Sequence, residues 1–454
     1  MNLWKYLKNK MQPNLQQIVC EANVFMTFEE LIVFAESFAK KLAGVHCCAI
    51  LCKSEMAASM ALLSCFAAKV TALPLSQRYG ELHCNKILDT ICPDGVITDQ
   101  NGELQIHYVT GSAYVEPEVH PALIMCTSGT TGIPKGAMLT ELNVMTNVSD
   151  VALYFDITDS DTILISRPLY HCAVLTGEFL TGLVKGVNIR FYSGRFNPAV
   201  VLKLLRQYKI TAFCGTPTLF QMLVRLKRSE VYYLKHICIS GECMSAETGK
   251  QIAEAFPAAE IYHVYGLTEA CPRVSYLPPS MFLQYADCVG ISLRSVSLKI
   301  VNRQGEPADL NEIGILWVKG DNIMAGYYNN PERTREIIKD GWLCTGDLAL
   351  FNDAGLLKIK GRSDDLIIKA GMNVYPQEIE SALRLDSRVH EAYIYGENDD
   401  KLGMQIILSV VGDFSDIAEV RELCNAYLPA YQIPSRIYLV NEIPKNGSGK
   451  IVRK

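Results

Sequence analysis

Apolar residues recur along the first part of the chain with a helical period. Between residues 28 and 42 they return every three to four positions, which predicts an amphipathic helix with one buried face. Thr27 is followed three residues later by Glu30, which is the spacing of a capping box. The sequence therefore predicts a helix that begins at Thr27 and runs to about Gly44.

The pattern then alternates between short apolar runs and helical periods. Residues 47–52 form an apolar run of strand length, residues 54–69 are helical, and residues 70–76 are strand-like again. This strand–helix–strand order favours a parallel sheet. The same order returns further along, with strands predicted at 209–214, 236–240 and 260–266 and helices predicted at 216–226 and 246–256.

The pattern changes after about residue 286. Residues 296–308 and 314–320 read as short strands separated by glycine and polar turns, which indicates a smaller β-rich region. A second boundary is expected near Gly361, because about 90 residues follow it with their own helices and a strand, enough for a small domain. We therefore predict an α/β fold with a large N-terminal domain of parallel α/β sheets plus a small β-rich subdomain (residues 1–361) and a small α+β C-terminal domain (residues 362–454).

The composition narrows the class of protein. Hydrophobic residues make up 49% of the chain and charged residues 20%, which describes a soluble globular protein. The net charge of −5 argues against a nucleic-acid partner, which usually requires a basic face. The 16 cysteines form no C-x-x-C pair, so we expect reduced thiols and a cytoplasmic location. No apolar stretch reaches the length of about 20 residues that a membrane span requires.

Candidate chemistry starts at residues 127–136, which read Thr-Ser-Gly-Thr-Thr-Gly-Ile-Pro-Lys-Gly after an apolar run. The three glycines let the backbone approach a ligand, while four hydroxyls, backbone N–H groups and Lys135 are all suited to phosphate oxygens. The run differs from the P-loop pattern, because Gly136 follows the lysine. Taken alone, the same run also fits a flexible surface loop.

Two further polar segments follow in the chain. Residues 265–269 come directly after a predicted strand, where an α/β sheet usually places its site. In this segment Tyr265 is suited to stacking on a base and Glu269 to holding a magnesium ion. Asp347 stands as a lone carboxylate after a glycine in residues 342–348 and is suited to the two hydroxyls of a ribose.

The segments 361–365 and 444–450 complete an ordered set of five motifs, and Lys450 closes the set on a Gly-Ser-Gly loop. At this point the sequence resembles the acyl-adenylate-forming enzymes. This family includes acyl- and aryl-CoA synthetases, adenylation domains of nonribosomal peptide synthetases and luciferases. The motifs run in the family's order from residue 127 to residue 450, and the nearest type is the stand-alone acyl- or aryl-CoA ligase.

The resemblance implies a role for each motif. It makes Lys450, Thr268 and Glu269 the catalytic residues, with Glu269 also the ligand of Mg²⁺. It places Tyr265 and Gly266 against the nucleotide. It assigns ATP phosphate binding to one loop, which comprises Thr127, Ser128, Gly129, Thr130, Thr131, Gly132 and Lys135.

The resemblance also implies how the small domain works. Asp347 would bind both ribose hydroxyls, with Arg362 beside it, and Asp364 would be the hinge of a mobile C-terminal domain. Lys450 would contact the substrate carboxylate and the α-phosphate during adenylation. The domain would then rotate, withdrawing the lysine and opening a path for a thiol, either coenzyme A or the phosphopantetheine arm of a carrier protein.

The acid to be activated is less defined. By resemblance His171 lines the acyl pocket, and Cys172 stands where amino-acid-activating domains carry an aspartate, so an α-amino acid is disfavoured. His171 is equally explained as a structural histidine. We expect Gly241, Val264 and Arg273 to line the pocket as well; Arg273 either meets a second polar group of the substrate or serves a structural role. An aryl acid and a medium-chain aliphatic acid both fit, and an aryl acid with a second carboxylate, such as succinylbenzoate, is a further alternative.

Two alternatives lie outside the ligase class. A luciferase-like oxygenase would share all five motifs, although nothing here indicates a luciferin pocket. A relative that only binds nucleotide would be expected to have lost Lys450 or Glu269, and both are present.

Overall fold

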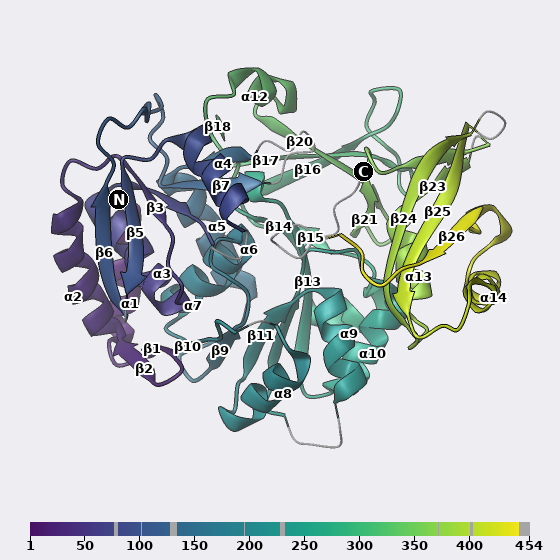
Figure 1. The fold of residues 1–454 in the computed structure, drawn as a ribbon, viewed down its shortest axis with the longest axis horizontal. Helices are drawn as coiled ribbons and strands as arrows, with labels where there is room; N and C mark the ends of the chain where they lie inside the picture. Colours follow the sequence, from purple (N-terminus) through teal and green to yellow (C-terminus); the bar gives the residue numbers. More distant parts are fainter. Residues whose placement is uncertain are drawn as a thin grey trace.

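The computed structural model describes residues 1–76, 80–100, 102–127, 134–194, 196–227, 232–370, 372–399 and 403–444. Four sheets with flanking helices make up the molecule, and the chain passes from the purple N-terminal elements to the yellow C-terminal ones (Figure 1). Residues 128–133, in the middle of the predicted phosphate loop, and residues 445–454, which include Lys450, lie outside the described residues.

A seven-stranded sheet contains the first predicted strand–helix–strand unit. Strands β3, β4, β5 and β7 pair in parallel, and β6, β8 and β18 pair antiparallel at the edges. Helix α3 (Glu55–Ala68) joins β3 to β4, and α4 (Glu81–Ile91) joins β4 to β5. Along the sheet the strands are β18 (Gly326–Tyr327), β8 (Lys135–Leu139), β7 (Leu123–Thr127), β4 (Thr71–Pro74), β3 (Cys47–Ile50), β5 (Gly95–Gln100) and β6 (Glu103–Tyr108).

A nine-stranded sheet forms the centre of the molecule. Its inner strands from β13 to β1 are parallel, and its edges β14, β15 and β2 are antiparallel. In order they are β15 (Ile291–Ser292), β14 (Arg273–Leu277), β13 (Glu260–Gly266), β12 (His236–Ile239), β11 (Ala212–Gly215), β9 (Thr162–Ile165), β10 (Asn188–Phe191), β1 (Ile18–Glu21) and β2 (Val24–Thr27).

The helices of this sheet follow the predicted alternation. Each of the predicted helices at 216–226 and 246–256 exists, with a side-chain cap from Thr216 or Ser245. The helices are α5 (Glu141–Tyr154), α6 (Cys172–Val174), α7 (Thr181–Lys185), α8 (Pro198–Gln207), α9 (Pro217–Leu226), α10 (Ala246–Ala255) and α11 (Phe282–Tyr285), with a π-helical segment at Leu175–Leu180 and 3-10 turns at Thr268–Ala270 and Pro279–Met281.

The N-terminal helices show one correct and one missed prediction. Helix α2 (Phe28–Ala39) has the predicted capping box, with Thr27 and Glu30 bonding reciprocally, and a 3-10 turn at Lys40–Leu42 completes the predicted length. Helix α1 (Leu3–Met11), followed by a 3-10 turn at Gln12–Asn14, was not predicted. Its buried face, which includes Leu3 and Leu7, belongs to the main core.

The predicted β-rich region is an antiparallel five-stranded sheet. Its strands are β16 (Val296–Val301), β17 (Gly314–Gly320), β19 (Ile338–Lys339), β20 (Trp342–Phe351) and β21 (Leu357–Arg362). Helix α12 (Pro331–Ile337) lies between β18 and β19 in the chain. The sheet packs on the main core through Leu316, Val318 and Leu343.

A second five-stranded sheet with its own apolar core follows residue 366. It consists of β22 (Ile367–Lys369), β23 (Met372–Val374), β24 (Val389–Asp399), β25 (Gly403–Gly412) and β26 (Arg436–Leu439), with helices α13 (Pro376–Leu383) and α14 (Ile417–Tyr427) and a 3-10 turn at Ala430–Gln432. Arg225 of α9 reaches across and donates to the carbonyl oxygens of Arg384 and Val389, at 3.0 and 3.1 Å. Together these sheets confirm the predicted fold class, and the domain boundary at 361/362 stays a prediction.

Two general predictions can be compared with the structure. All 16 cysteines carry free thiols, and most are buried. Among the described residues, no helix combines the length and apolar character that crossing a membrane would require.

Candidate active site

The motif residues gather at one edge of the central sheet. Strands β9, β11, β12 and β13 are parallel, so their carboxyl ends meet at the same edge, where α/β sheets place ligands. Tyr265 and Gly266 end β13, and Thr268 and Glu269 lie in the 3-10 turn that follows. Gly241 lies two residues after the end of β12, with φ +96°, and Val264 is buried within β13.

Asp347 is the centre of a first polar cluster. The β20–β21 ladder places Asp347 directly opposite Arg362, and their Oδ1 and Nη1 atoms lie 3.4 Å apart. The Tyr265 hydroxyl donates to the other carboxylate oxygen. Burial, together with the charge of Asp347, raises the pKa of Tyr265 well above its ordinary value. The phenol therefore stays protonated, and a carboxylate from one sheet is tied to a tyrosine from another.

Glu269 belongs to a second cluster. Its Oε1 accepts a hydrogen bond of 2.7 Å from the hydroxyl of Tyr327, a residue that pairs with Ala137 between β18 and β8. The Lys135 ammonium lies 5.8 Å from the centre of the Tyr327 ring. Burial and the nearby Arg333 lower the pKa of Lys135, while Glu269 opposes that shift. The cluster thus places a cation over the ring of Tyr327 and a carboxylate at its hydroxyl.

Sequence reasoning did not identify Tyr327. It lies in a two-residue edge strand within a glycine–tyrosine–tyrosine stretch that carries no catalytic residue type. Its position depends on pairing with β8, almost 200 residues earlier in the chain. Tyr327 is buried, at 7% exposure, and its hydroxyl contacts Glu269.

Gly266 separates the two clusters and has no room for a side chain. A Cβ atom at this position would lie 1.9 Å from the carbonyl oxygen of Pro272, on the opposite strand of the β13–β14 ladder. The same carbonyl already accepts a hydrogen bond from the backbone of Leu267. The turn that carries Thr268 and Glu269 therefore depends on a glycine here.

We expect Gly266→Ala to lower the free energy of unfolding by about 1–3 kcal/mol, because the strand must move to admit the methyl group. Urea unfolding followed by circular dichroism measures this loss. Gly305→Ala is the control, since no atom lies within 4 Å of a Cβ atom there and only its positive φ opposes the change. Equal losses in the two variants would show that close packing at Gly266 is not the cause.

His171 begins the segment predicted to line the acid pocket. It precedes α6, and its ring lies 4.2 Å from that of Tyr170, measured between centroids. Cys172 is buried, and its carbonyl accepts a hydrogen bond from Thr176. Thr176 also lies 3.2 Å from the carbonyl oxygen of Cys271, in the loop after Glu269. The segment that begins at His171 is thereby connected to the loop that follows Glu269.

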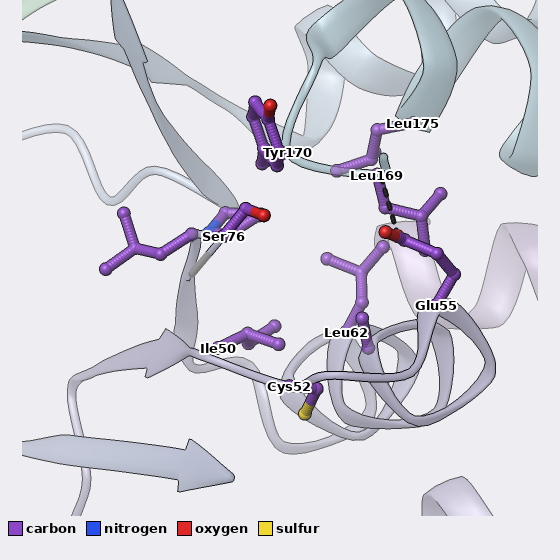
Figure 2. Close-up of a pocket in the computed structure, with 11 residues that line it drawn as sticks. Ile50, Cys52, Glu55, Leu62, Ser76, Leu169, Tyr170 and Leu175 are labelled. Carbon is purple, nitrogen blue, oxygen red and sulfur yellow. Dashed lines mark hydrogen bonds between the residues drawn. The ribbon is translucent and has the colours of Figure 1, made fainter. Parts of the chain in front are cut away.

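A small cavity lies beneath this segment, at the carboxyl ends of β3 and β4 (Figure 2). Glu55, in the first turn of α3, accepts a hydrogen bond of 2.9 Å from the backbone of Leu169. The cavity volume of about 10 Å³ leaves room for one water molecule. The cavity is therefore too small to be the acid site. The bond from Leu169 to Glu55 holds the backbone just before His171 in place.

The remaining predicted residues are placed as follows. Arg273 begins β14 and is only 1% exposed. Asp364 is exposed in the connection between β21 and β22, next to Ser363. Thr127 ends β7 opposite Lys135. Ser128, Gly129, Thr130, Thr131, Gly132 and Lys450 lie outside the described residues.

Comparison with known proteins follows this geometry. Residues 112–328 match the AMP-binding enzyme family, and residues 378–450 match the AMP-binding enzyme C-terminal domain. Over 337 residues the chain is 30% identical to feruloyl-CoA synthase from Amycolatopsis sp, covering 73% of this chain and 68% of that relative. The chain belongs to the AMP-binding enzyme family. The resemblance seen in the five motifs is confirmed.

A second relative in this family is long-chain-fatty-acid–CoA ligase from Haemophilus influenzae, 33% identical over 358 residues. That alignment covers 75% of this chain and 63% of the ligase, so it spans less than two thirds of the relative. The two relatives are named for different acids, one aryl and one aliphatic. Family membership therefore does not identify the acid, which depends on the residues that line the acid pocket.

Among solved structures, the chain resembles o-succinylbenzoate CoA synthetase from Bacillus subtilis in complex with its acyl-adenylate intermediate. The TM-score is 0.87 at 26% identity, over 100% of this chain and 97% of that one. The same synthetase with ATP and a magnesium ion gives a TM-score of 0.85. Its double mutant bound to a product analogue gives 0.71. The structure of this chain is therefore more similar to these two nucleotide-bound forms than to the form with the product analogue.

Proposed function

We propose that this protein activates a carboxylic acid with ATP and transfers the acyl group to the thiol of coenzyme A. The observation that carries the proposal is the pair of polar clusters on either side of Gly266 in a member of the AMP-binding enzyme family. One cluster joins Asp347 to Tyr265 and Arg362. The other joins Glu269 to the Tyr327 hydroxyl, with the Lys135 ammonium over the Tyr327 ring.

The first cluster suits the nucleoside of ATP. The Asp347 carboxylate would accept hydrogen bonds from both ribose hydroxyls, and Arg362 and Tyr265 already hold it in place. Tyr265 and Gly266 would lie against the adenine, and Thr268 would donate to the α-phosphate. Lys135, together with Thr127, Ser128, Gly129, Thr130, Thr131 and Gly132, would hold the β- and γ-phosphates.

Glu269 is suited to hold a magnesium ion. Its Oε2 makes no hydrogen bond to any described residue, and the side chain is half-buried and close enough to Lys135 to interact with it electrostatically. Magnesium commonly binds one or two carboxylates together with substrate phosphates. The described residues contain no group of three or more potential metal ligands, which fits that mode of binding. When bound, the ion would neutralise phosphate charge during adenylation.

In the first half-reaction a carboxylate oxygen of the acid attacks the α-phosphorus of ATP. The bond from that phosphorus to the β-phosphate oxygen breaks, and pyrophosphate leaves. Lys450 would bring positive charge to the attacking carboxylate and the α-phosphate, where negative charge gathers. In the second half-reaction the thiol sulfur attacks the acyl carbon, AMP leaves, and the thiol proton passes to solvent.

The C-terminal domain would change position between the two steps. We place the boundary at 361/362 and the hinge at Asp364, which is exposed between β21 and β22. The higher TM-score against the acyl-adenylate complex than against the product-analogue complex supports an arrangement of this chain suited to adenylation. Arg225 bonding to Arg384 and Val389 would then have to release during the change.

Coenzyme A is the preferred acceptor, because both curated relatives are named as CoA ligases or synthases. Transfer to a carrier protein uses the same thiol chemistry, and no relative described above is named for it. Incubating the enzyme with its acid, ATP and either coenzyme A or a holo-carrier protein separates the two. Faster thioester formation on the carrier would overturn the choice of coenzyme A. We also propose a cytoplasmic location, consistent with the free thiols.

Exchange of labelled pyrophosphate into ATP tests the adenylation itself. A panel of aryl and medium-chain aliphatic acids, with and without a second carboxylate, should include at least one acid that drives exchange. The exchange should require magnesium and should not require coenzyme A. Absence of exchange with every acid would favour a protein that only binds nucleotide.

A further inference from the structure

Arg273 is the largest fully buried side chain among the described residues, at 1% exposure. Its backbone is fixed by Asn147, which donates to the Arg273 carbonyl at 2.8 Å and accepts from its N–H at 3.2 Å. On the β13–β14 ladder it stands opposite Gly266. The Arg273 backbone is therefore held beside residues 265–269, and its side chain is directed into the protein.

The guanidinium group is poorly satisfied for such a buried charge. Among the described residues its one hydrogen bond runs from Nη2 to the Cys238 sulfur at 4.0 Å, and Tyr154 and Cys214 also lie close enough to interact with it electrostatically. Its Nε has no hydrogen-bond partner, and it forms no ion pair with a carboxylate of any described residue. A buried arginine usually has a bidentate carboxylate or phosphate partner. This pattern leaves donors available to an anion from outside the chain.

The acidic side chain that influences Arg273, Glu178, is already paired with another arginine. Glu178 is 1% exposed and pairs with Arg167, with 2.5 Å between Oε1 and Nη2. Glu178 interacts electrostatically with both Arg167 and Arg273, so one buried carboxylate is shared between a partly exposed arginine and a buried one. A buried charge without a carboxylate partner of its own is unfavourable, although neighbouring side chains, Glu178 among them, favour the charged form of Arg273. A bound anionic group would compensate it.

Gly177 places this charge at the segment predicted to line the acid pocket. A Cβ atom on Gly177 would lie 3.0 Å from the Arg273 Nη2 and 3.1 Å from its Nε. Gly177 lies in the π-helical turn Leu175–Leu180, shortly after His171 and Cys172. Such turns are frequent at functional sites. The guanidinium thus lies against the segment that follows His171 and Cys172, while the Arg273 backbone lies opposite Gly266 of β13.

We propose that Arg273 is a specificity-determining residue that binds a second carboxylate, at the far end of the substrate from the one that is adenylated. The substrate is then a dicarboxylic acid. This inference rests on the proposed function, because it concerns the same acid pocket. The second carboxylate would give the unpartnered N–H donors of Arg273 an acceptor and its buried guanidinium a counter-ion.

Pairs of acids of equal shape test the proposal in the wild-type enzyme. Each pair is a dicarboxylic acid, from succinic to suberic acid or a benzene dicarboxylic acid, and its counterpart with an isopropyl group in place of the second carboxylate. In pyrophosphate exchange, at least one diacid should exceed its counterpart in kcat/KM by about 10- to 100-fold. Exchange with the isopropyl acids that matches or exceeds that with the diacids overturns the inference and leaves adenylation intact.

Variants at Arg273 separate specificity from a structural role. Arg273→Leu should remove the preference for the diacid, and Arg273→Lys should keep part of it. If Arg273 had only a structural role, its substitution would lower the activity on both acids and leave the ratio of the two activities unchanged. If Arg273→Leu does not fold, the wild-type ratio and Arg273→Lys still decide. Absence of exchange with every acid of either kind would instead overturn the proposed function, and this inference with it.

Discussion

Lys450→Ala should slow adenylation by about 100- to 1,000-fold, the usual cost of removing one charged contact to the developing negative charge. The carboxylate of the acid and the α-phosphate are both anionic, and Lys450 would be the cation that lets them approach. Formation of the thioester from preformed acyl-adenylate should stay near the wild-type rate, because the lysine would have left the site by then.

Measuring the two half-reactions separately checks this prediction. Pyrophosphate exchange reports the first, and release of AMP from synthetic acyl-adenylate with coenzyme A reports the second. Lys454→Ala, which removes a lysine four positions further along, is the matched control and should change neither rate. Equal losses in both half-reactions of Lys450→Ala would contradict the assignment of this lysine to adenylation.

Asp347→Ala should lower kcat/KM for ATP by about 100-fold, since two hydrogen bonds from ribose hydroxyls to a charged acceptor would be lost. The change also leaves the Tyr265 hydroxyl and the Arg362 guanidinium without their shared partner. Both groups should then become less ordered where the nucleoside binds. The KM of the acid should change far less than the KM of ATP.

Steady-state kinetics with each substrate varied in turn measures the difference. Asp353→Ala is a suitable control, because Asp353 lies in the turn between β20 and β21. Among the described residues, its side chain bonds only to that of Asn311, at 2.6 Å. That control should retain wild-type kinetics. An unchanged KM for ATP in Asp347→Ala would show that Asp347 does not contact the nucleotide.

Local sequence patterns predicted much of the fold because they reflect local physics. The capping box at Thr27 and Glu30 and the strand at 260–266 appear as expected, since caps and apolar runs act over a few residues. Helix α1 was missed because its lysines obscured a face formed by Leu3, Leu7 and Met11. That face becomes buried only through packing against distant parts of the chain.

The sequence motifs identified most of the candidate site residues. They did not show the contacts that depend on how distant strands pair. Asp347 and Arg362 both belong to motifs, yet only the β20–β21 register shows that they face each other. Tyr327 reaches Glu269 through a two-residue strand with no sequence signal. The unpartnered Nε of Arg273 depends on Glu178 pairing with Arg167 instead, a choice that spacing alone does not reveal.

The identity of the nucleotide product tests the central claim most directly. Purified enzyme is incubated with ATP, magnesium, coenzyme A and an acid that supports exchange, and the products are quantified by chromatography and mass spectrometry. Adenylation predicts AMP, pyrophosphate and acyl-CoA in equal amounts, all dependent on the acid. Formation of ADP and phosphate, or of AMP at the same rate without the acid, would contradict it.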